Sequence, residues 1–227
     1  MAQDAALKQK ALDVLVESDR HGWSYQWSWL GLPIIQMPPD VIATQEVIWE
    51  MKPDVIVETG VARGGSLILY ASILQLIGKG KVVGVDIDIR PHNRDSIESH
   101  PLAHRIELIQ GSSVAADVLA DVRSRIPAGS KVMVILDSNH THQHVYDELK
   151  LYAPLVTEGQ FLIVADTVVE DIPAQEHRPR PWGPGDNPAT AMQAFLAEDK
   201  AFAPDPFINA KLLITSSPGG YLRRVKG

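Results

Sequence analysis

The residues best suited to chemistry are two acids and a histidine that stand where apolar runs end. Asp137 follows the apolar run 132–136, and His140 comes three residues later. Asp166 follows a second apolar run, residues 161–165. The carboxyl ends of neighbouring parallel strands meet at one edge of a sheet, so we expect Asp137 and Asp166 to converge on one hard cation such as Mg²⁺. Two carboxylates are few ligands, and they leave open whether a metal binds.

His140 is the candidate general base, because an imidazole with a pKa of about 6.5 can accept a proton from a hydroxyl near neutral pH. The alternative is a helix-cap or surface histidine. His142 and His144 follow at alternate positions. Alternate spacing at the start of a helix does not place three imidazoles on one side. We therefore interpret His142 and His144 as cap or surface residues rather than as metal ligands.

A glycine-rich segment, residues 58–66, lies between an apolar run and a segment with the pattern of a helix. Its glycines permit a tight turn and a close approach of the backbone to a ligand. The free N–H groups and the positive dipole end of the helix point at this loop. The segment lacks the Gly-Lys-Ser/Thr ending of a phosphate-binding loop and the Gly-x-Gly-x-x-Gly spacing of a dinucleotide site. It fits the acid-x-Gly-x-x-x-Gly pattern of S-adenosylmethionine loops, with a ligand-free turn as the alternative.

The residues expected to contact this cofactor come from four places along one edge of the sheet. The loop contributes Glu58, Gly60, Ala62, Gly64 and Ser66. An acid at the tip of the next strand can accept hydrogen bonds from both ribose hydroxyls, which favours Asp86 and makes Asp88 the second candidate. Ser112 and Ser113 follow the third strand, where we expect the adenine, and Asp137 borders the cofactor from the fourth strand.

Apolar runs alternate with helix-like segments, which predicts an α/β fold with a mostly parallel, Rossmann-like sheet and helices on both faces. The expected strands are residues 55–58, 82–86, 105–109, 132–137 and 161–166. The expected helices are residues 5–19, 38–51, 67–77, 114–125, 144–152 and 190–199. Asp40 is the expected cap of the second helix. Segments 211–215 and 221–225 predict a closing antiparallel C-terminal hairpin around residues 218–220.

The composition limits the classes of protein to which this chain can belong. Its 227 residues suit one α/β domain, residues 1–227, in which residues 1–40 form a helical and aromatic N-terminal extension. A net charge of −7 argues against nonspecific binding of nucleic acid, and the absence of cysteine excludes disulfides and thiolate chemistry. The sequence has no apolar run long enough for a membrane span or a signal peptide, so we expect a soluble, cytoplasmic protein.

Two segments outside the strand pattern are candidates for substrate contact. The proline-rich residues 173–188 are long for a connection, which is typical of lids, and a surface loop is the alternative. Trp23, Trp27 and Trp29 form an aromatic segment near the N-terminus. We expect at least two of these rings to pack in the core or at an interface, although aromatic rings also stack on sugars.

Several motifs taken together resemble the cephalosporin hydroxylase family. They are Trp29-Leu30-Gly31, Gln45-Glu46, Lys52-Pro53-Asp54, Glu58-Thr59-Gly60, Gly64-Gly65-Ser66, Asp137-Ser138-Asn139-His140, Pro181-Trp182-Gly183, Asn187-Pro188, the run 211–215 and Gly220-Tyr221-Leu222. The resemblance covers the chain from about Trp23 onward. It implies the class I S-adenosylmethionine-dependent methyltransferase fold and relatives that methylate rhamnosyl groups. It also favours a homo-oligomer.

The resemblance implies roles for the acids and the histidine. The site also resembles that of catechol O-methyltransferase, in which an acid after the fourth strand binds magnesium and a base follows three residues later. Asp137 and His140 occupy these positions. An antibiotic-pathway member of the family has two adjacent acids after the fifth strand, whereas this chain has Ala165 followed by Asp166. The expected magnesium site, made of Asp137 and Asp166, therefore has one acid fewer.

We therefore predict an S-adenosylmethionine-dependent O-methyltransferase that acts on a hydroxyl of a sugar or glycosylated small molecule, with magnesium assistance left open. Two alternatives remain. The chain could keep the cofactor fold for binding or assembly without catalysis, which the presence of Ala165 favours slightly. It could instead be a metal-dependent hydroxylase, as the family name suggests, with iron held by His140, His142 and Asp137.

Overall fold

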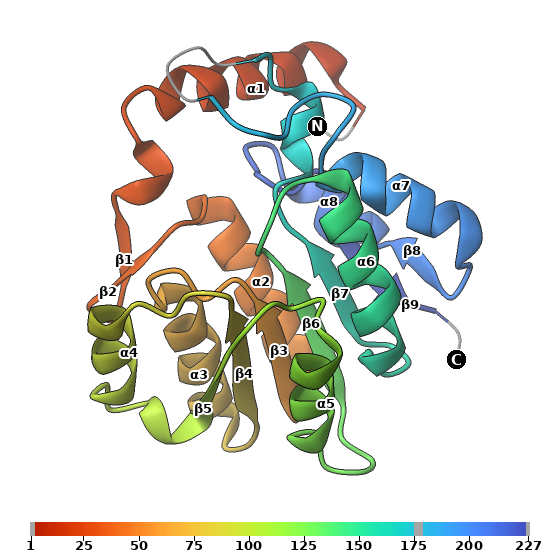
Figure 1. The fold of residues 1–227 in the computed structure, drawn as a ribbon. Helices are drawn as coiled ribbons and strands as arrows, with labels where there is room; N and C mark the ends of the chain where they lie inside the picture. The colour runs from red at the N-terminus through yellow and green to blue at the C-terminus, as the bar shows by residue number, and fades with distance from the viewer. Residues whose placement is uncertain (1–2, 175–178, 226–227) are drawn as a thin grey trace.

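The computed structural model of the chain describes residues 3–174 and 179–225. Within these residues the main element is a seven-stranded sheet with the order β5-β4-β3-β6-β7-β9-β8 (Figure 1). The strands are β3 (Val55–Thr59), β4 (Lys81–Asp86), β5 (Ile106–Gln110), β6 (Val132–Leu136), β7 (Phe161–Val164), β8 (Phe202–Pro204) and β9 (Tyr221–Arg224). Strands β3 to β7 pair in parallel, and β9 pairs antiparallel with β7 and β8. The predicted parallel sheet with an antiparallel C-terminal edge is confirmed.

Helices cover both faces of the sheet. On one face lie α2 (Pro38–Met51), α3 (Gly65–Ile77), α4 (Pro91–Glu98) and α8 (Pro206–Lys211). On the other lie α5 (Ala116–Ser124), α6 (His142–Tyr152) and α7 (Pro188–Glu198). Successive side chains of a strand point to opposite faces, so each parallel strand contributes side chains to both cores. This is why the sequence of each parallel strand is a continuous apolar run. In the described part of the chain, every helix falls short of the length and apolar character needed to cross a bilayer.

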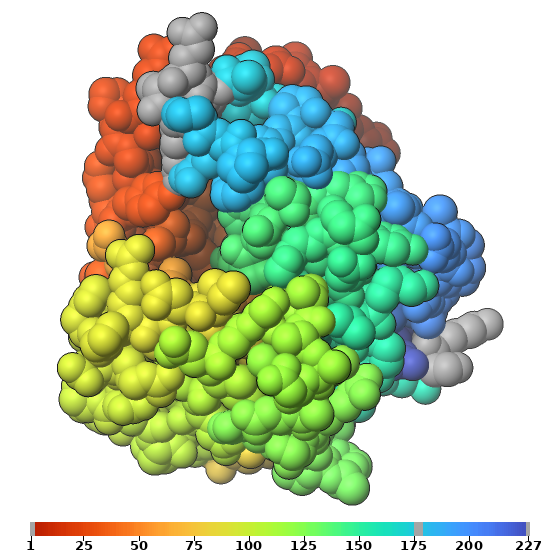
Figure 2. Space-filling model, in the orientation of Figure 1, coloured from red at the N-terminus to blue at the C-terminus, as the bar shows by residue number. Residues whose placement is uncertain are grey.

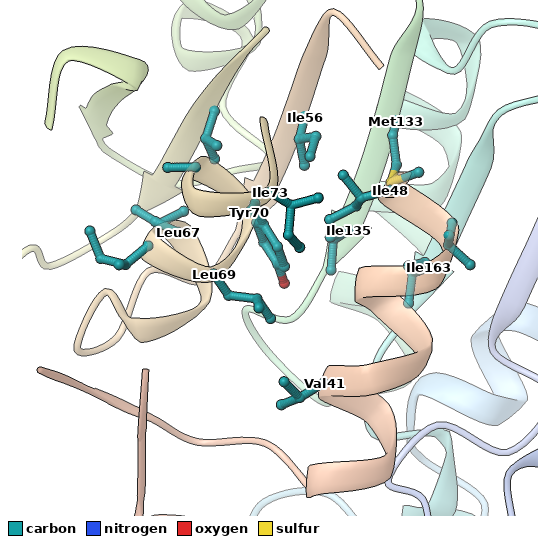
Figure 3. Packing of buried hydrophobic residues seen from close by; sticks show 14 of the residues in the cluster. Val41, Ile48, Ile56, Leu67, Leu69, Tyr70, Ile73, Met133, Ile135 and Ile163 are labelled. Carbon is teal, nitrogen blue, oxygen red and sulfur yellow. The ribbon is translucent and has the colours of Figure 1, made fainter. Parts of the chain in front are cut away.

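The core on the first face shows how the sheet is fixed against α2 and α3. Ile48 of α2 and Tyr70 of α3 lie beside Ile56 and Ile135 of the central strands (Figure 3). All four side chains are buried. This packing holds the start of α3 directly behind the carboxyl end of β3, where the glycine-rich loop lies.

The N-terminal segment lies apart from the sheet. It comprises α1 (Ala5–Asp19), a short 3₁₀ helix (Trp23–Tyr25) and a hairpin of β1 (Trp27–Trp29) with β2 (Leu32–Ile34) (Figure 1). The indole N–H of Trp29 donates to the Ser72 hydroxyl of α3 at 3.1 Å, which fastens the hairpin to the core. The rings of Trp23 and Trp27 meet edge to face. Trp29 thus packs against the core, whereas Trp27 is exposed, and the packing of at least two of the tryptophans stays a prediction.

The predicted cap of α2 is wrong. Pro38 and Pro39 occupy the first two helical positions and have no N–H to satisfy, so the helix needs little capping. Asp40 instead turns its buried carboxylate toward the other end of the chain. There it accepts hydrogen bonds from the hydroxyl of Thr215 and from the backbone N–H of Ser216.

The predicted strand at residues 211–215 is also wrong, although an antiparallel pair does close the sheet. Asp205 caps α8 by accepting hydrogen bonds from the N–H groups of Phe207 and Ile208 at 2.9 Å. Pro206 fits the first position of that helix. The helix therefore continues to Lys211, and the strand that pairs with β9 is β8, before the helix.

The strand order creates a switch point at the centre of the sheet. β3 lies between β4 and β6, so successive crossovers leave β3 in opposite directions. In open α/β sheets, ligands bind beyond the carboxyl ends of the strands at such a point. Gly60 follows β3 and Asp137 follows β6. The glycine-rich loop and the first predicted acid therefore meet where this fold places its ligands.

Candidate active site

A cavity of about 640 Å³ lies at this switch point. It is lined by the loop 60–66, by Asp137, His140 and Asp166, by parts of α1 and the β1–β2 segment, and by residues 179–184. Figure 2 shows the hollow between the red-orange N-terminal segment and the green segment that follows β6. The cavity thus brings the predicted cofactor loop and the predicted catalytic residues to one space.

Close backbone contacts fix the shape of the glycine-rich loop. Gly60 has φ +98°, and a Cβ at this position would overlap the carbonyl oxygen of Asp137. A Cβ on Gly65 would overlap the carbonyl of Pro33. These two positions need glycine because the backbone of β6 and of β2 lies where a side chain would stand. The loop therefore touches both the strand that carries Asp137 and the N-terminal segment.

Glu58 lies under the loop and does not line the cavity. Its carboxylate accepts hydrogen bonds from the hydroxyls of Ser66 at 2.7 Å and Tyr70 at 2.8 Å. Burial raises the pKa of Glu58 to about 8, although both hydrogen bonds lower it. Ser66, a second predicted cofactor residue, lines the cavity, but its hydroxyl donates its hydrogen bond to Glu58. Glu58 therefore supports the loop from below.

Asp86 holds the loop from the side. Its Oδ2 accepts hydrogen bonds from the N–H groups of Val61 at 2.8 Å and Ala62 at 3.0 Å. Asn93 of α4 donates to the carbonyl of Ala62 at 2.9 Å. Ala62 has φ +45°, a left-handed conformation that costs a non-glycine residue about 1–2 kcal/mol. These hydrogen bonds help to hold it there.

The other residues predicted at the ribose and adenine lie outside the cavity lining. Asp88 is exposed and its carboxylate lies 3.9 Å from Arg90. Ser113 is buried, with its hydroxyl 3.1 Å from Nε2 of His144, whereas Ser112 is half-buried. The cofactor roles of Asp86, Asp88, Ser112 and Ser113 thus stay predictions.

The predicted acids and histidine form one compact cluster. Asp137, His140 and Asp166 each present a ligand atom within 4.8 Å of the other two. Nε2 of His140 lies 2.9 Å from Oδ2 of Asp166. Asp166 has φ +54°, a left-handed conformation that aspartate tolerates better than most residues and that turns the chain after β7. Strand ends therefore deliver the two carboxylates, as the sequence predicts.

The charges of the cluster are coupled. Burial raises the pKa of Asp137 well above its usual range, and repulsion by Asp166 raises it further. Burial alone would lower the pKa of His140, but attraction to Asp166 and their hydrogen bond outweigh it and raise the pKa to about 9. Burial likewise raises the pKa of Asp166, but His140 holds it below its usual value. His140 therefore keeps its proton at neutral pH and forms an ion pair with Asp166.

The donor set fits a hard divalent cation. Among the described residues, no hydrogen-bond donor satisfies the carboxylate of Asp137, although burial makes an unpaired charge costly there. A second carboxylate, Asp166, lies within reach of the same point. Magnesium commonly uses one or two carboxylates and completes its shell with water. The missing acid at Ala165 therefore does not rule the cation out.

Two aromatic and cationic residues of the site were not predicted as site residues. The ring of Trp182 meets the imidazole of His140 edge to face at a centroid distance of 4.8 Å. The guanidinium of Arg180 lies 5.3 Å from the centre of the Trp182 ring. Both belong to the proline-rich segment predicted as a lid, of which residues 175–178 lie outside the described residues. A tryptophan in a polar loop was the signal that could have found this contact.

His142 and His144 are half-buried and make contacts outside the acid cluster, so their interpretation as cap or surface residues stays a prediction. Nδ1 of His142 lies 2.8 Å from the hydroxyl of Thr190 in α7. Nε2 of His144 lies 3.3 Å from the Ser138 hydroxyl and 3.5 Å from the buried carboxylate of Glu148. The first contact joins α6 to α7, and the others lie within α6 or join it to the loop before it.

Comparison with known proteins gives consistent matches along the chain. The family model described as Rhamnosyl O-methyltransferase/CmcI matches residues 21–225. A rhamnosyl O-methyltransferase of Mycobacterium leprae (strain TN) is 30% identical over 190 residues, which are 81% of this chain and 79% of the relative. An apo structure of CmcI has a TM-score of 0.62 at 21% identity, over 89% of this chain and 78% of CmcI. A Mg-SAM structure of CmcI has a TM-score of 0.60 at 20% identity, with the same coverage. These structural likenesses establish the fold.

Proposed function

We propose that this chain, which belongs to the Rhamnosyl O-methyltransferase/CmcI family, transfers a methyl group from S-adenosylmethionine to a hydroxyl of a sugar or glycosylated small molecule. The match to the family model confirms the predicted family. The likeness to the CmcI structure confirms the predicted class I fold. As a member of this family the chain is an S-adenosylmethionine-dependent O-methyltransferase. The proposal goes beyond this activity in naming the acceptor as a sugar hydroxyl.

The observation that carries the proposal is the shared cavity. The glycine-rich loop forms one wall of it, and His140 with Asp137 and Asp166 forms another. S-adenosylmethionine, when bound, supplies a methyl group on a positively charged sulfonium. Methyl transfer is an in-line displacement, so the main task of the protein is to hold an acceptor oxygen close to the methyl group and aligned with it. A single space bordered by loop and base meets that requirement.

His140 is the proposed general base for the acceptor hydroxyl. Asp166 fixes the orientation of its imidazole through the contact at 2.9 Å. A divalent cation on Asp137 and Asp166 would orient the acceptor oxygen and lower the pKa of its hydroxyl. The same positive charge would offset the two carboxylates that raise the pKa of His140, so that the imidazole could accept a proton near neutral pH.

The acceptor side of the cavity is made by segments that come from outside the parallel strands. Leu15 and Asp19 of α1, Tyr25 of the 3₁₀ helix and Trp182 of the proline-rich segment line it. This mixture of apolar, aromatic and polar groups suits a sugar, which presents both apolar faces and hydroxyls. The name of the Mycobacterium leprae relative supports the same class of acceptor. We propose that residues 1–40 are an extension of a single domain that selects the acceptor.

The hydroxylase alternative is not favoured by the site. A facial triad for non-haem iron needs two histidines and a carboxylate. Among the described residues, the cluster able to hold a metal contains one histidine, His140, and two carboxylates. His142 is engaged with Thr190 instead.

The proposal is tested by isothermal titration calorimetry with S-adenosylhomocysteine, with and without Mg²⁺. We expect micromolar binding that tightens with Mg²⁺. A second assay follows methyl transfer from labelled S-adenosylmethionine to a panel of rhamnosides, with catechol as the non-sugar comparison. An absence of S-adenosylhomocysteine binding under both conditions would contradict the methyltransferase function. Transfer to catechol with none to any sugar would contradict the acceptor class.

A further inference from the structure

A second, much smaller cavity lies behind the acid cluster. Its volume of about 20 Å³ has room for roughly one water molecule. Asp137, Asp166 and Ala165 line it on the sheet side, and Asp40 lines it from α2. The Oε1 atom of Gln36 also borders this space and is buried without a hydrogen-bond partner among the described residues. An acceptor in this state favours a polar occupant that can donate a hydrogen bond.

Asp40 is tied to Asp166 through a single residue. Ser216 donates its backbone N–H to Oδ2 of Asp40 at 2.8 Å, and its hydroxyl lies 3.2 Å from the same oxygen. Ser216 and Asp166 also border the same small cavity, where the Ser216 hydroxyl lowers the pKa of the Asp166 carboxyl. A hydroxyl has one proton to donate. In the structure this proton goes to Asp40, which the backbone N–H also serves, so the hydroxyl can turn toward Asp166 without leaving Asp40 unpaired.

The Asp40 carboxylate has hydrogen-bond donors but no cationic partner of its own among the described residues. The side chain is 4% exposed, and the groups that hydrogen-bond to it, from Thr215 and Ser216, are neutral. Burying a carboxylate beside a second carboxylate is unfavourable unless a positive charge lies close to both. The proposed cation at Asp137 and Asp166 would be such a charge. Ala165, where the family resemblance implies an acid, presents only a methyl group beside the small cavity.

We propose that Asp40 is a positioning residue of the cation site and that it supplies from α2 the negative charge that Ala165 does not. Asp40 acts on the cation through Ser216 and through a water in the small cavity, without direct coordination. The inference rests on the proposed cation site of this methyltransferase. Partners of this kind, outside the direct ligands, typically change metal affinity by about 10- to 100-fold.

The test measures binding of Mn²⁺ by electron paramagnetic resonance, with Mn²⁺ as the probe for the magnesium site. We expect Asp40→Asn, which keeps the shape of the side chain, to weaken Mn²⁺ binding about tenfold. Thr44→Val is the matched control. Thr44 is buried one turn further along α2, borders the same cavity and contacts the Tyr221 hydroxyl at 3.1 Å. We expect this control to change Mn²⁺ binding less than twofold.

A second background tests whether the charge of Asp40 is what matters. It places an acid at position 165, next to Asp166. In an Ala165→Glu background, we expect Asp40→Asn to weaken Mn²⁺ binding less than twofold, because Glu at 165 then supplies the charge. A tenfold loss in both backgrounds would overturn the compensation. Equal losses for Asp40→Asn and Thr44→Val would show a purely structural role, and no loss for either would show that Asp40 has no role in cation binding.

The failure of this inference can be told apart from failure of the proposed function. Each variant is also titrated with S-adenosylhomocysteine in the absence of metal and melted in the apo form. If the unsubstituted chain binds S-adenosylhomocysteine but does not bind Mn²⁺, the role of Asp40 is overturned. The methyltransferase proposal then still stands. Loss of S-adenosylhomocysteine binding by the unsubstituted chain would instead remove the function on which the inference rests.

Discussion

The glycine-rich loop and the acid cluster border the same cavity, but different physics holds each in place. The loop is fixed by shape, since Gly60 and Gly65 lie where other backbone leaves no space for a Cβ. The cluster is fixed by charge, since His140 and Asp166 hold each other through an ion pair within hydrogen-bond distance. The loop takes its contacts from β2, β6 and α4, whereas the cluster is assembled from the ends of β6 and β7.

This difference teaches where each half of the site is vulnerable. A larger side chain in the loop displaces the backbone, so we expect it to reduce the affinity for the cofactor. A change of charge in the cluster leaves the backbone in place, so we expect it to reduce turnover while cofactor binding survives. Substitutions in the two regions should therefore separate binding from catalysis.

The largest effect is expected for His140→Ala. Loss of a general base typically costs about 10²–10⁴-fold in rate. We expect turnover to fall by that factor while the affinity for S-adenosylhomocysteine changes less than twofold. His142→Ala is the matched control, because His142 lies two residues away and contacts Thr190 rather than the cavity. Methyl transfer and calorimetry on both variants check this. Equal turnover of His140→Ala and the unsubstituted chain would remove His140 from the base role.

Gly60→Ala is the steric counterpart. A methyl group at Gly60 would overlap the carbonyl oxygen of Asp137, and the positive φ adds strain. We expect a loss of stability of about 2–4 kcal/mol and at least a tenfold weaker affinity for S-adenosylhomocysteine. Gly129→Ala is the control, since Gly129 has a similar φ of +80° with open space around it. Thermal melting and calorimetry compare the two. Similar behaviour of both variants would show that strain alone, without the overlap, explains the effect.

The elements of the cluster could be predicted because the acids follow apolar runs. A run of four or five buried residues defines a parallel strand, and the residue after it must lie at the carboxyl edge. Asp137 and Asp166 are such residues, and the structure brings them together with His140. The loop was predictable for the same reason, since its glycines follow β3 directly.

The orientation of Glu58 was missed although it follows from the strand, whereas the place of Asp40 could not be predicted from local patterns. Glu58 and Ile56 are two positions apart in β3, so their side chains lie on the same face of the sheet. The side chain of Glu58 therefore points at α3 rather than into the cavity. Strand alternation could have given this result, but the motif pattern was followed instead. Asp40 reaches Ser216 across 176 positions of sequence. Local patterns carry no information about such a pair, because tertiary packing determines it.

Asp86→Ala has an intermediate expected effect and sharpens the comparison within the loop. It removes a charged acceptor from the N–H groups of Val61 and Ala62. Hydrogen bonds to charged groups contribute about 1.5–3 kcal/mol, reduced here by solvent exposure, so we expect affinity for S-adenosylhomocysteine to fall about tenfold. Asp88→Ala, at an exposed acid two residues later, should change it less than twofold. The reverse order of the two effects would make Asp88 the residue that binds the ribose.

The last prediction concerns stability and its dependence on pH, with no change expected in the chemistry of the site. Burial raises the pKa of Glu58 from 4.5 to about 8, so the folded chain holds a proton there that the unfolded chain releases above pH 4.5. Stability must then fall as pH rises from about 4.5 to 8, by at most about 1.4 kcal/mol per pH unit from this group. Glu58→Gln keeps the shape of the side chain and removes the titration.

We therefore expect the free energy of unfolding of Glu58→Gln, minus that of the unsubstituted chain, to rise with pH across this range and to level off above pH 8. Urea unfolding at a series of pH values measures this difference. Asp40, whose burial raises its pKa to about 6, contributes to both proteins equally and cancels. A difference independent of pH would mean that Glu58 is ionised beneath the loop. The loop would then depend on charge, as the cluster does, and the contrast between the two regions would fail.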